Sequence, residues 1–260
     1  MLDEEEYEDR ARDWAGIMPQ KGHSLNLIRR ILKTLGRGVV LKRHLPREFA
    51  SVPLLVSPDS ALAYWRRDIA RVDPFLLSMV RELVRPEMTV WDIGANVGLF
   101  SFAAASLGAQ VVAVEPDIWL ANLMLRSTRI NKLPVTVLPA AVSDGPGISK
   151  LYLSDHGRAS NSLRGSGPAQ TVLTITLDSL LNHFVAPQVL KIDVEGMEYA
   201  VLKGAEKVLQ FRPSILCEVT ENHDLVGELL RGAQYEFCAA REGNRRPLQR
   251  PSRDTLARPV

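Results

Sequence analysis

Two short segments carry acidic residues and glycines at points where a strand is followed directly by a helix. The first, residues 90–98, reads VWDIGANVG. Gly94 permits the backbone angles of a tight turn, and its missing side chain lets a ligand approach the main chain. Gly98 allows close contact at the start of the next helix, whose free N–H groups face the crevice. Because Asp92 can accept a hydrogen bond from a hydroxyl or ammonium group, this segment predicts a nucleoside-binding turn.

An acidic residue about twenty positions further on supplies the second half of this site. Glu115 ends the next expected strand, where a carboxylate accepts hydrogen bonds from both ribose hydroxyls of a nucleoside. A dinucleotide site requires G-x-G-x-x-G, because its middle glycine makes room for pyrophosphate, and Asn96 stands at that position here. The D-x-G-x-x-x-G spacing instead fits a cofactor with a short amino-acid tail, whose charged groups meet the turn amides and Asp92. We therefore expect S-adenosyl-L-methionine as the cofactor.

The residues after the third expected strand are placed to receive the adenine ring. Ala141 and Val142 are small enough to leave room for a flat ring, and Ser143 and Asp144 follow them directly. Asp144 or a neighbouring backbone group can accept a hydrogen bond from the exocyclic amine. The alternative is that the sequence Ser-Asp-Gly here only forms a favourable turn.

The second chemical segment, residues 190–198, reads LKIDVEGME and again delivers acids at the end of a strand. Ligands of open parallel sheets bind at those strand ends, so Asp193 and Glu195 should face the transferred methyl group. They are suited to orient an acceptor hydroxyl, take its proton, or hold a divalent cation that lowers the hydroxyl pKa. His223 is the best-placed imidazole for a general base, although its position favours the alternative of a surface residue that caps a helix. For Glu198, favouring the start of the next helix is sufficient explanation.

The hydrophobic pattern places both segments in one α/β domain. Strands are expected at 89–93, 110–114, 135–138, 189–192, 215–219 and 235–239, and helices at 73–84, 97–107, 117–130, 197–209 and 225–230. Strands that are apolar on both faces and separated by helices predict a doubly wound, mostly parallel Rossmann-like sheet. Residues 143–176 interrupt the alternation and are expected to form an inserted β-hairpin, either a substrate lid or a flexible excursion.

The ends of the chain differ from its centre in composition. Residues 1–55 are expected to form a partly disordered N-terminal extension with a basic amphipathic helix at 24–35, residues 56–240 the catalytic domain, and residues 241–260 an Arg/Pro-rich tail. The basic helix is suited to cover its own domain or to make peripheral contact with a membrane or partner. The total of 260 residues carries a net charge of +2, two cysteines and no apolar run long enough to span a bilayer, which favours a cytoplasmic protein without disulfides.

Taken together, the motifs resemble the FkbM family of methyltransferases. The matching segments are WDIGANVGLFS (91–101), AVSD (141–144), TLDSLL (176–181), LKIDVEGMEYAVLKGA (190–205) and RPSILCEV (212–219). The resemblance implies a class I methyltransferase fold, and many members of the family are associated with O-methylation of sugars, polyketides or other natural products. It also implies that Asp92, Gly94, Gly98 and Glu115 bind the cofactor, and that Asp193 and Glu195 belong to the active centre. The family fold usually closes with a reversed strand, which residues 241–260 predict to be short or missing.

The most direct interpretation is O-methylation of a small-molecule or glycan acceptor. An RNA methyltransferase is a second possibility, with the basic segment 21–47 and the Arg-rich tail holding phosphates. No basic patch interleaved with aromatic residues is present to stack on bases, which argues against a nucleic-acid partner. A non-catalytic cofactor-binding scaffold is a third possibility, and the acids at Asp193 and Glu195 argue against it. Metal dependence and the oligomeric state stay open at this point.

Overall fold

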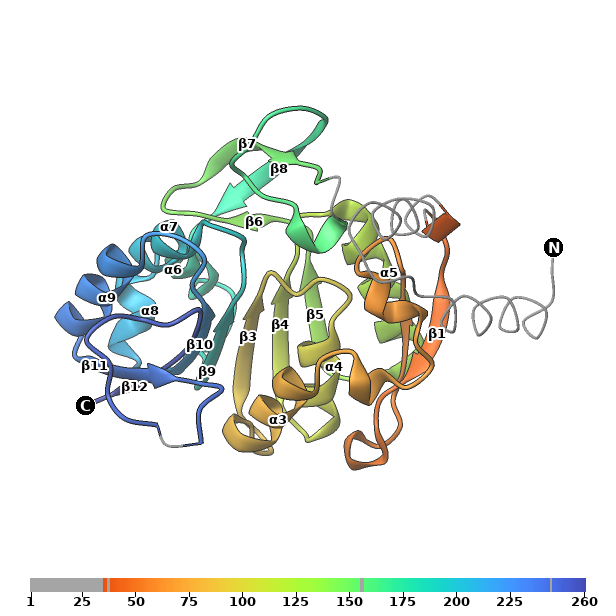
Figure 1. The fold of residues 1–260 in the computed structure, drawn as a ribbon, viewed down its shortest axis with the longest axis horizontal. Coiled ribbons are helices and arrows are strands. Elements are labelled where there is room, and N and C mark those ends of the chain that lie inside the picture. The colour runs from red at the N-terminus through yellow and green to blue at the C-terminus, as the bar shows by residue number, and fades with distance from the viewer. Residues whose placement is uncertain (1–34, 37, 155–156, 244) are drawn as a thin grey trace, which may run out of the picture.

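A seven-stranded sheet forms the centre of the computed structural model, which describes residues 35–36, 38–154, 157–243 and 245–260 (Figure 1). The strand order is β11-β12-β10-β9-β3-β4-β5. Only β12 runs against its neighbours, and the other pairs are parallel. The bounds are β3 (Thr89–Ile93), β4 (Gln110–Val114), β5 (Val135–Leu138), β9 (Val189–Ile192), β10 (Ser214–Glu218), β11 (Tyr235–Ala239) and β12 (Asp254–Pro259). The expected doubly wound, mostly parallel fold is confirmed.

Helices cover both faces of this sheet because its strand residues are apolar on both sides. Val90 packs into the core on one face, with α3 (Pro74–Leu83), α4 (Leu99–Ser106) and α5 (Ile118–Asn131). The adjacent Trp91 is fully buried in the core on the other face, with α6 (Leu177–Leu180), α7 (Glu198–Lys203), α8 (Glu206–Gln210) and α9 (His223–Gly232). The central strands are therefore held between two apolar layers.

Local sequence signals fix most helix limits. Asp73 caps α3 by accepting a hydrogen bond from the Leu76 amide at 2.9 Å, and Asp117 caps α5 in the same way. The single helix expected at 197–209 is wrong: two short helices stand there, separated at Gly204. A Cβ on this glycine would lie 2.4 Å from the Ser143 carbonyl oxygen, so the chain presses against the loop after β6. That tertiary contact interrupts a pattern that reads as one helix.

The segment before the main sheet forms a hairpin that was not expected from the sequence. β1 (Leu41–His44) pairs antiparallel with β2 (Pro53–Val56), with the 3-10 turn η1 (Arg47–Phe49) between them. Leu55 donates its amide hydrogen bond to the Ser127 hydroxyl at 2.9 Å, which ties the hairpin to α5. β2 thus crosses the domain boundary expected at residue 55. The basic helix expected at 24–35 lies almost entirely outside the described residues.

The insertion after β5 forms a separate three-stranded sheet, and the expected hairpin is confirmed. Its strands are β6 (Ala141–Val142), β7 (Gly147–Tyr152) and β8 (Ala169–Ile175), in the order β6-β8-β7. Because β6 begins just after β5 ends, this sheet stands at the carboxyl edge of the main sheet, seen at the top of Figure 1. Three further 3-10 turns are η2 (Leu62–Trp65), η3 (Ile69–Arg71) and η4 (Arg158–Ser160).

The closing strand is present, so the expectation that it is short or missing is wrong. β12 lies between β10 and β11 and pairs with both. Thr255, Leu256 and Ala257 are buried, and these three residues suffice because the strand is covered on both sides. The surrounding arginines pair with acids elsewhere in the domain, as Arg253 does with Glu218. Much of the polar composition of residues 241–260 therefore belongs to the loop before β12, and the strand needs only its three buried residues.

Candidate active site

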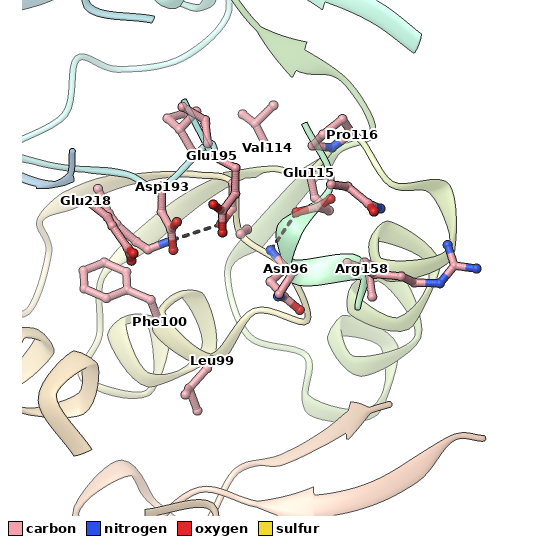
Figure 2. A pocket seen from close by; sticks show the side chains of 18 of the residues that line it. Asn96, Leu99, Phe100, Val114, Glu115, Pro116, Arg158, Asp193, Glu195 and Glu218 are labelled. Carbon is pink, nitrogen blue, oxygen red and sulfur yellow. Dashed lines mark hydrogen bonds and ion pairs between the residues drawn. The ribbon is translucent and has the colours of Figure 1, made fainter. Parts of the chain in front are cut away.

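A cavity of about 290 Å³ opens at the carboxyl edge of the main sheet, where the two chemical segments meet (Figure 2). Both segments, the chain before α3 and the insertion contribute to its wall. The residues that matter for chemistry are Tyr64, Asp73, Gly94, Ala95, Asn96, Glu115, Ala141, Val142, Arg158, Asn161, Ser162, Lys191, Asp193, Glu195 and Glu218. The sequence-predicted nucleoside turn and the sequence-predicted acids thus share one cavity.

Gly94 brings the two segments into direct contact. Its φ of +74° is in the left-handed region, and an ideal Cβ on it would lie only 1.7 Å from the Asp193 carbonyl oxygen. The glycine is therefore required by contact with the neighbouring strand end as well as by the turn. Gly98 caps α4 at φ +87°, with the Phe102 ring and the Met124 methyl less than 3 Å from the position of a Cβ.

The Glu115 carboxylate lies at the end of β4 and lines the cavity. Its two oxygens accept hydrogen bonds from the amides of Asn96 (2.7 Å) and Asp117 (2.8 Å). Burial is the main cause that raises the pKa of Glu115 to about 8, and the two amide hydrogen bonds oppose it. A carboxylate has about four lone-pair sites, so acceptor capacity is left over on the cavity side.

Asn96 completes the first turn in a left-handed conformation, which asparagine adopts more readily than most residues. Its φ of +54° is left-handed, and its side-chain oxygen accepts a hydrogen bond from the Ser60 hydroxyl. The turn is thereby attached to the chain before α3. Glu195, in the corresponding turn after β9, has a φ of +49°. For a residue other than glycine or asparagine this conformation costs of order 1–3 kcal/mol, and such strain clusters at functional sites.

Asp92 lies beneath the turn and not on the cavity wall. It is fully buried, accepts a hydrogen bond from the Ser101 hydroxyl at 2.6 Å, and lies 3.1 Å from the Lys191 ammonium. The same ammonium lies 3.4 Å from the Asp193 carboxylate and donates to the Gly94 carbonyl at 2.9 Å. Asp92 therefore supports the cavity floor. It is connected to the cavity wall through Lys191, a residue to which the sequence alone assigned no role.

Three carboxylates gather on the side of the cavity opposite Glu115. Figure 2 shows Asp193, Glu195 and Glu218 side by side, away from Asn96 and Glu115. Burial, followed by the charges of Asp193 and Glu218, raises the pKa of Glu195 to about 7. Burial and Asp193 likewise raise the pKa of Glu218, against the effect of Arg253. The pKa of Glu195 is therefore close to neutral pH, where its carboxylate can both accept and release a proton.

Glu218 belongs to this group, and the sequence analysis missed it. It ends β10, the parallel neighbour of β9, so its side chain emerges at the same sheet edge as Asp193. Its Oε1 accepts hydrogen bonds from Arg253 Nη2 (2.6 Å) and Nε (2.8 Å). An acid at the end of the next parallel strand was a usable signal.

The insertion covers the cavity and is attached to its rim by polar contacts. Arg158 pairs with Asp59 and Asp117, each at 2.7 Å, and its amide donates to the Asp59 carbonyl at 3.0 Å. Asn161 donates to Asp117 at 2.8 Å, and the Ser162 hydroxyl donates to the Glu195 carbonyl at 2.7 Å. The insertion therefore joins the Asp117 side of the cavity rim to the side on which Glu195 stands.

Several sequence-predicted site residues stand off the cavity wall. Ala141 and Val142 line it, whereas Ser143 and Asp144 do not, and Asp144 pairs with Lys203 at 3.1 Å. His223 is the first residue of α9, and its Nδ1 lies 2.8 Å from the Pro251 carbonyl, away from the wall. Glu198 accepts from the Gly196 amide at 2.8 Å and so stabilises the turn after β9.

Within the part of the chain that the structure describes, no three His, Cys, Asp or Glu side chains form a group suited to hold a metal ion. Likewise, none of the described helices is long and apolar enough to cross a membrane.

The geometry fits a nucleoside cofactor with a short polar tail. Glu115 is a buried carboxylate whose hydrogen bonds come only from backbone amides, and its remaining lone pairs suit ribose hydroxyls. The Gly94–Asn96 turn faces the same cavity. Residue 96 is asparagine, whereas a site for pyrophosphate requires glycine at this position. A doubly wound sheet with its closing strand reversed and this turn after its central strand is the class I methyltransferase fold.

Comparison with known proteins assigns the chain to a family. The family described as "Methyltransferase FkbM domain" matches residues 92–237, more than half of the chain, and the protein belongs to it. Hexuronic acid methyltransferase AglP of Haloferax volcanii is 27% identical over 162 residues, which cover 60% of this chain and 65% of that protein. The chain thus spans just under two thirds of the length of this relative.

Two further similarities are more limited. Ribosomal protein L11 methyltransferase of Desulfitobacterium hafniense is 33% identical over 57 residues, which cover 22% of this chain and 18% of that protein. Among solved structures, a T. thermophilus 16S rRNA methyltransferase in complex with AdoMet and guanosine aligns with a TM-score of 0.48 and 15% identity. That alignment covers 85% of this chain and 50% of the other.

Proposed function

We propose that this protein transfers the methyl group of S-adenosyl-L-methionine to a hydroxyl oxygen of a sugar or another small-molecule or glycan acceptor. One observation carries the proposal. A single cavity has a carboxylate suited to ribose hydroxyls, Glu115, on one side and the acids Asp193 and Glu195 on the other. The sugar class is favoured by the relative named hexuronic acid methyltransferase, and by acids placed where hydroxyls must be oriented.

The cofactor end of the cavity has a distinct task for each residue. Glu115 accepts hydrogen bonds from the ribose hydroxyls, and the Gly94–Asn96 turn contacts the amino-acid tail. The adenine ring packs against Ala141 and Val142, which line the same cavity. Ser143 and Asp144 follow them and shape this end of the site without facing it.

The acceptor end supplies orientation and a base. When bound, S-adenosyl-L-methionine supplies a methyl group that is activated by its positively charged sulfur. Asp193, held by Lys191, orients the acceptor hydroxyl, and Glu195 takes the hydroxyl proton on its carboxylate. With its proton on Glu195, the acceptor oxygen would be free to accept the methyl group of a cofactor bound in this cavity. The insertion excludes water, so most of the rate enhancement comes from alignment in a closed site.

Glu195 replaces His223 as the base in this proposal. Glu195 lines the cavity, and its raised pKa of about 7 suits proton transfer at neutral pH. The His223 ring lies against the Pro251 carbonyl at the start of α9. Its expected contribution is to the attachment of α9 to the loop before β12.

Calorimetric titration with S-adenosyl-L-methionine tests the cofactor site. Wild type should bind, Glu115→Ala should lose binding, and Glu228→Ala, an exposed acid on α9, should bind as wild type does. Equal binding by Glu115→Ala and wild type would refute the assignment of the ribose site. If all three proteins bound the cofactor equally well, the protein would still be a cofactor-binding methyltransferase, but Glu115 would not be its ribose ligand.

Transfer of a labelled methyl group tests the activity. The purified protein is incubated with labelled cofactor and, in turn, neutral sugars, uronic acids, RNA and a cell extract. Label in a sugar supports the proposal, whereas label only in RNA, lost steeply with added salt, supports the RNA alternative. Bound cofactor with no transfer to any of them favours a scaffold. Turnover with and without a chelator tests whether the reaction depends on a divalent cation, which the sequence leaves open.

A further inference from the structure

Lys191 is a buried cation at the point where the two chemical segments meet. It lies on β9, directly opposite Asp92 on the parallel strand β3, and is only 5% exposed. Its ammonium has three N–H donors. It donates a hydrogen bond to the Gly94 carbonyl (2.9 Å) and forms ion pairs with the Asp92 carboxylate (3.1 Å) and the Asp193 carboxylate (3.4 Å). A buried lysine is rare unless it is paired, so this arrangement is a built feature of the cavity floor.

The three partners have different places in the site. Gly94 is the first residue of the cofactor turn, Asp193 faces the acceptor side, and Asp92 lies below both. Lys191 itself lines the cavity between them. A single side chain thus fixes the position of the turn carbonyl relative to the acceptor-side carboxylate.

The charge on Lys191 is maintained by its neighbours. Burial lowers the pKa of its amine, but the Asp92 and Asp193 carboxylates raise it by more, and the net pKa is above the ordinary value. The ammonium therefore stays charged at neutral pH. One cation between two carboxylates leaves this part of the floor with a single negative charge.

We propose that Lys191 is a positioning residue that couples the cofactor turn to Asp193 and sets the balance of charge beside the cofactor's sulfonium. The inference rests on the proposed function, because it requires S-adenosyl-L-methionine to lie in this cavity. The role is indirect: Lys191 acts through Gly94 and Asp193.

The charge balance has a consequence that can be measured without an acceptor. S-adenosyl-L-methionine carries one positive charge more than its product S-adenosyl-L-homocysteine. Removing a cation from the floor therefore favours the charged cofactor over the neutral product. Loss of position alone weakens both ligands equally. The ratio of the two dissociation constants separates the electrostatic role from a merely structural one.

The experiment measures both dissociation constants by calorimetry on the full chain. Lys191→Met should raise the cofactor Kd by about tenfold and the product Kd by about thirty- to hundredfold, so that the ratio of the product Kd to the cofactor Kd rises by about three- to tenfold. Lys191→Arg, which keeps the charge, should leave the ratio within about twofold of wild type. Lys207→Met, the same change at an exposed lysine on α8, should alter neither constant. An unchanged ratio in Lys191→Met overturns the inference.

In Lys191→Met, Asp92 and Asp193 lose their cation, and the variant could fail to fold for that reason. A second starting protein, Asp92→Asn, keeps the test decisive in that case. In Asp92→Asn one of the two acids is already neutral, so the further change Lys191→Met leaves only Asp193 without its partner. The double variant should show a higher ratio than Asp92→Asn alone, and an equal ratio again overturns the inference. Should wild type bind neither ligand, the proposed function itself fails, which is a different result from an unchanged ratio.

Discussion

The α-carbon of Gly94 and the carbonyl oxygen of Asp193 are so close that no side chain fits between them. An ideal Cβ at residue 94 would stand 1.7 Å from that oxygen, and the backbone of residue 94 is left-handed at φ +74°. The Gly94–Asn96 turn and Asp193 are therefore fixed against each other through the main chain. Any side chain at residue 94 must push the two strand ends apart.

We predict that Gly94→Ala separates these two halves of the site. The clash and the unfavourable φ should together cost about 3 kcal/mol of the free energy of unfolding, and cofactor binding should be lost. Urea unfolding and calorimetry measure the two effects. Gly145→Ala is the matched control, because a Cβ there meets nothing within 4 Å and its backbone is not left-handed. A normal affinity in Gly94→Ala would mean that the turn is not part of the cofactor site.

Glu195→Gln should remove the proposed base while keeping the shape of the site. The amide is nearly isosteric but accepts no proton, so turnover on the first acceptor found should fall by about 10²- to 10⁴-fold. The Kd for S-adenosyl-L-methionine should change by less than about threefold, since Glu195 is on the acceptor side. Glu228→Gln on the exposed face of α9 should leave both values unchanged. Full turnover in Glu195→Gln would show that another group accepts the proton of the acceptor hydroxyl.

The pH dependence of turnover should identify the same carboxylate. Burial, then Asp193 and Glu218, raise the pKa of Glu195 to about 7. A base works in its deprotonated form, so turnover should rise with pH through about 7 and level off above it. Asp193→Asn removes one of the negative charges that raise the pKa of Glu195. The rising limb of the pH profile should therefore move to lower pH, in addition to a lower turnover. A limb that stays in place, measured over pH 5–9 at constant ionic strength, would show that Glu195 is not the titrating group.

The order of the central elements follows from the sequence for a physical reason. Strands buried on both faces must be continuous apolar runs, and 89–93, 110–114 and 189–192 were predicted to the residue. The positions of Glu115, Asp193 and Glu195 follow as well, because parallel strands bring their carboxyl ends to one edge. Each of these inferences needs only local pattern and chain order.

Features that depend on tertiary contacts were not predicted. Lys191 reads as one polar residue in an apolar strand, and its role appears only when β3 places Asp92 beside it. Gly204 divides a helix because Ser143 presses against it, which no local pattern encodes. β12 has three buried residues within an arginine-rich segment, too few to stand out against their neighbours. Arg158 and Glu218 reach the site from distant parts of the chain.

The contact of Arg158 with Asp59 and Asp117 predicts that the insertion controls exchange of the cofactor. Arg158→Met removes two partly buried ion pairs, worth about 1–3 kcal/mol, from the closed position of this cover. Dissociation of S-adenosyl-L-methionine, followed by stopped-flow mixing, should become several-fold faster. Arg126→Met, an exposed arginine on α5, should not change the rate. If Arg158→Met releases the cofactor at the wild-type rate, the insertion is not a lid on this site.

The closing strand makes the last residues of the chain part of the core, and this can be tested away from the active site. Leu256 is 1% exposed and pairs with Leu216 of β10 and Cys238 of β11. Leu256→Ala leaves a cavity between the sheet and the helices on one face, and should lower the free energy of unfolding by about 2–5 kcal/mol. Val260→Ala truncates a side chain that is 75% exposed and should change it by less than about 0.5 kcal/mol. Equal stability of the two variants in urea unfolding would place residues 254–259 outside the sheet.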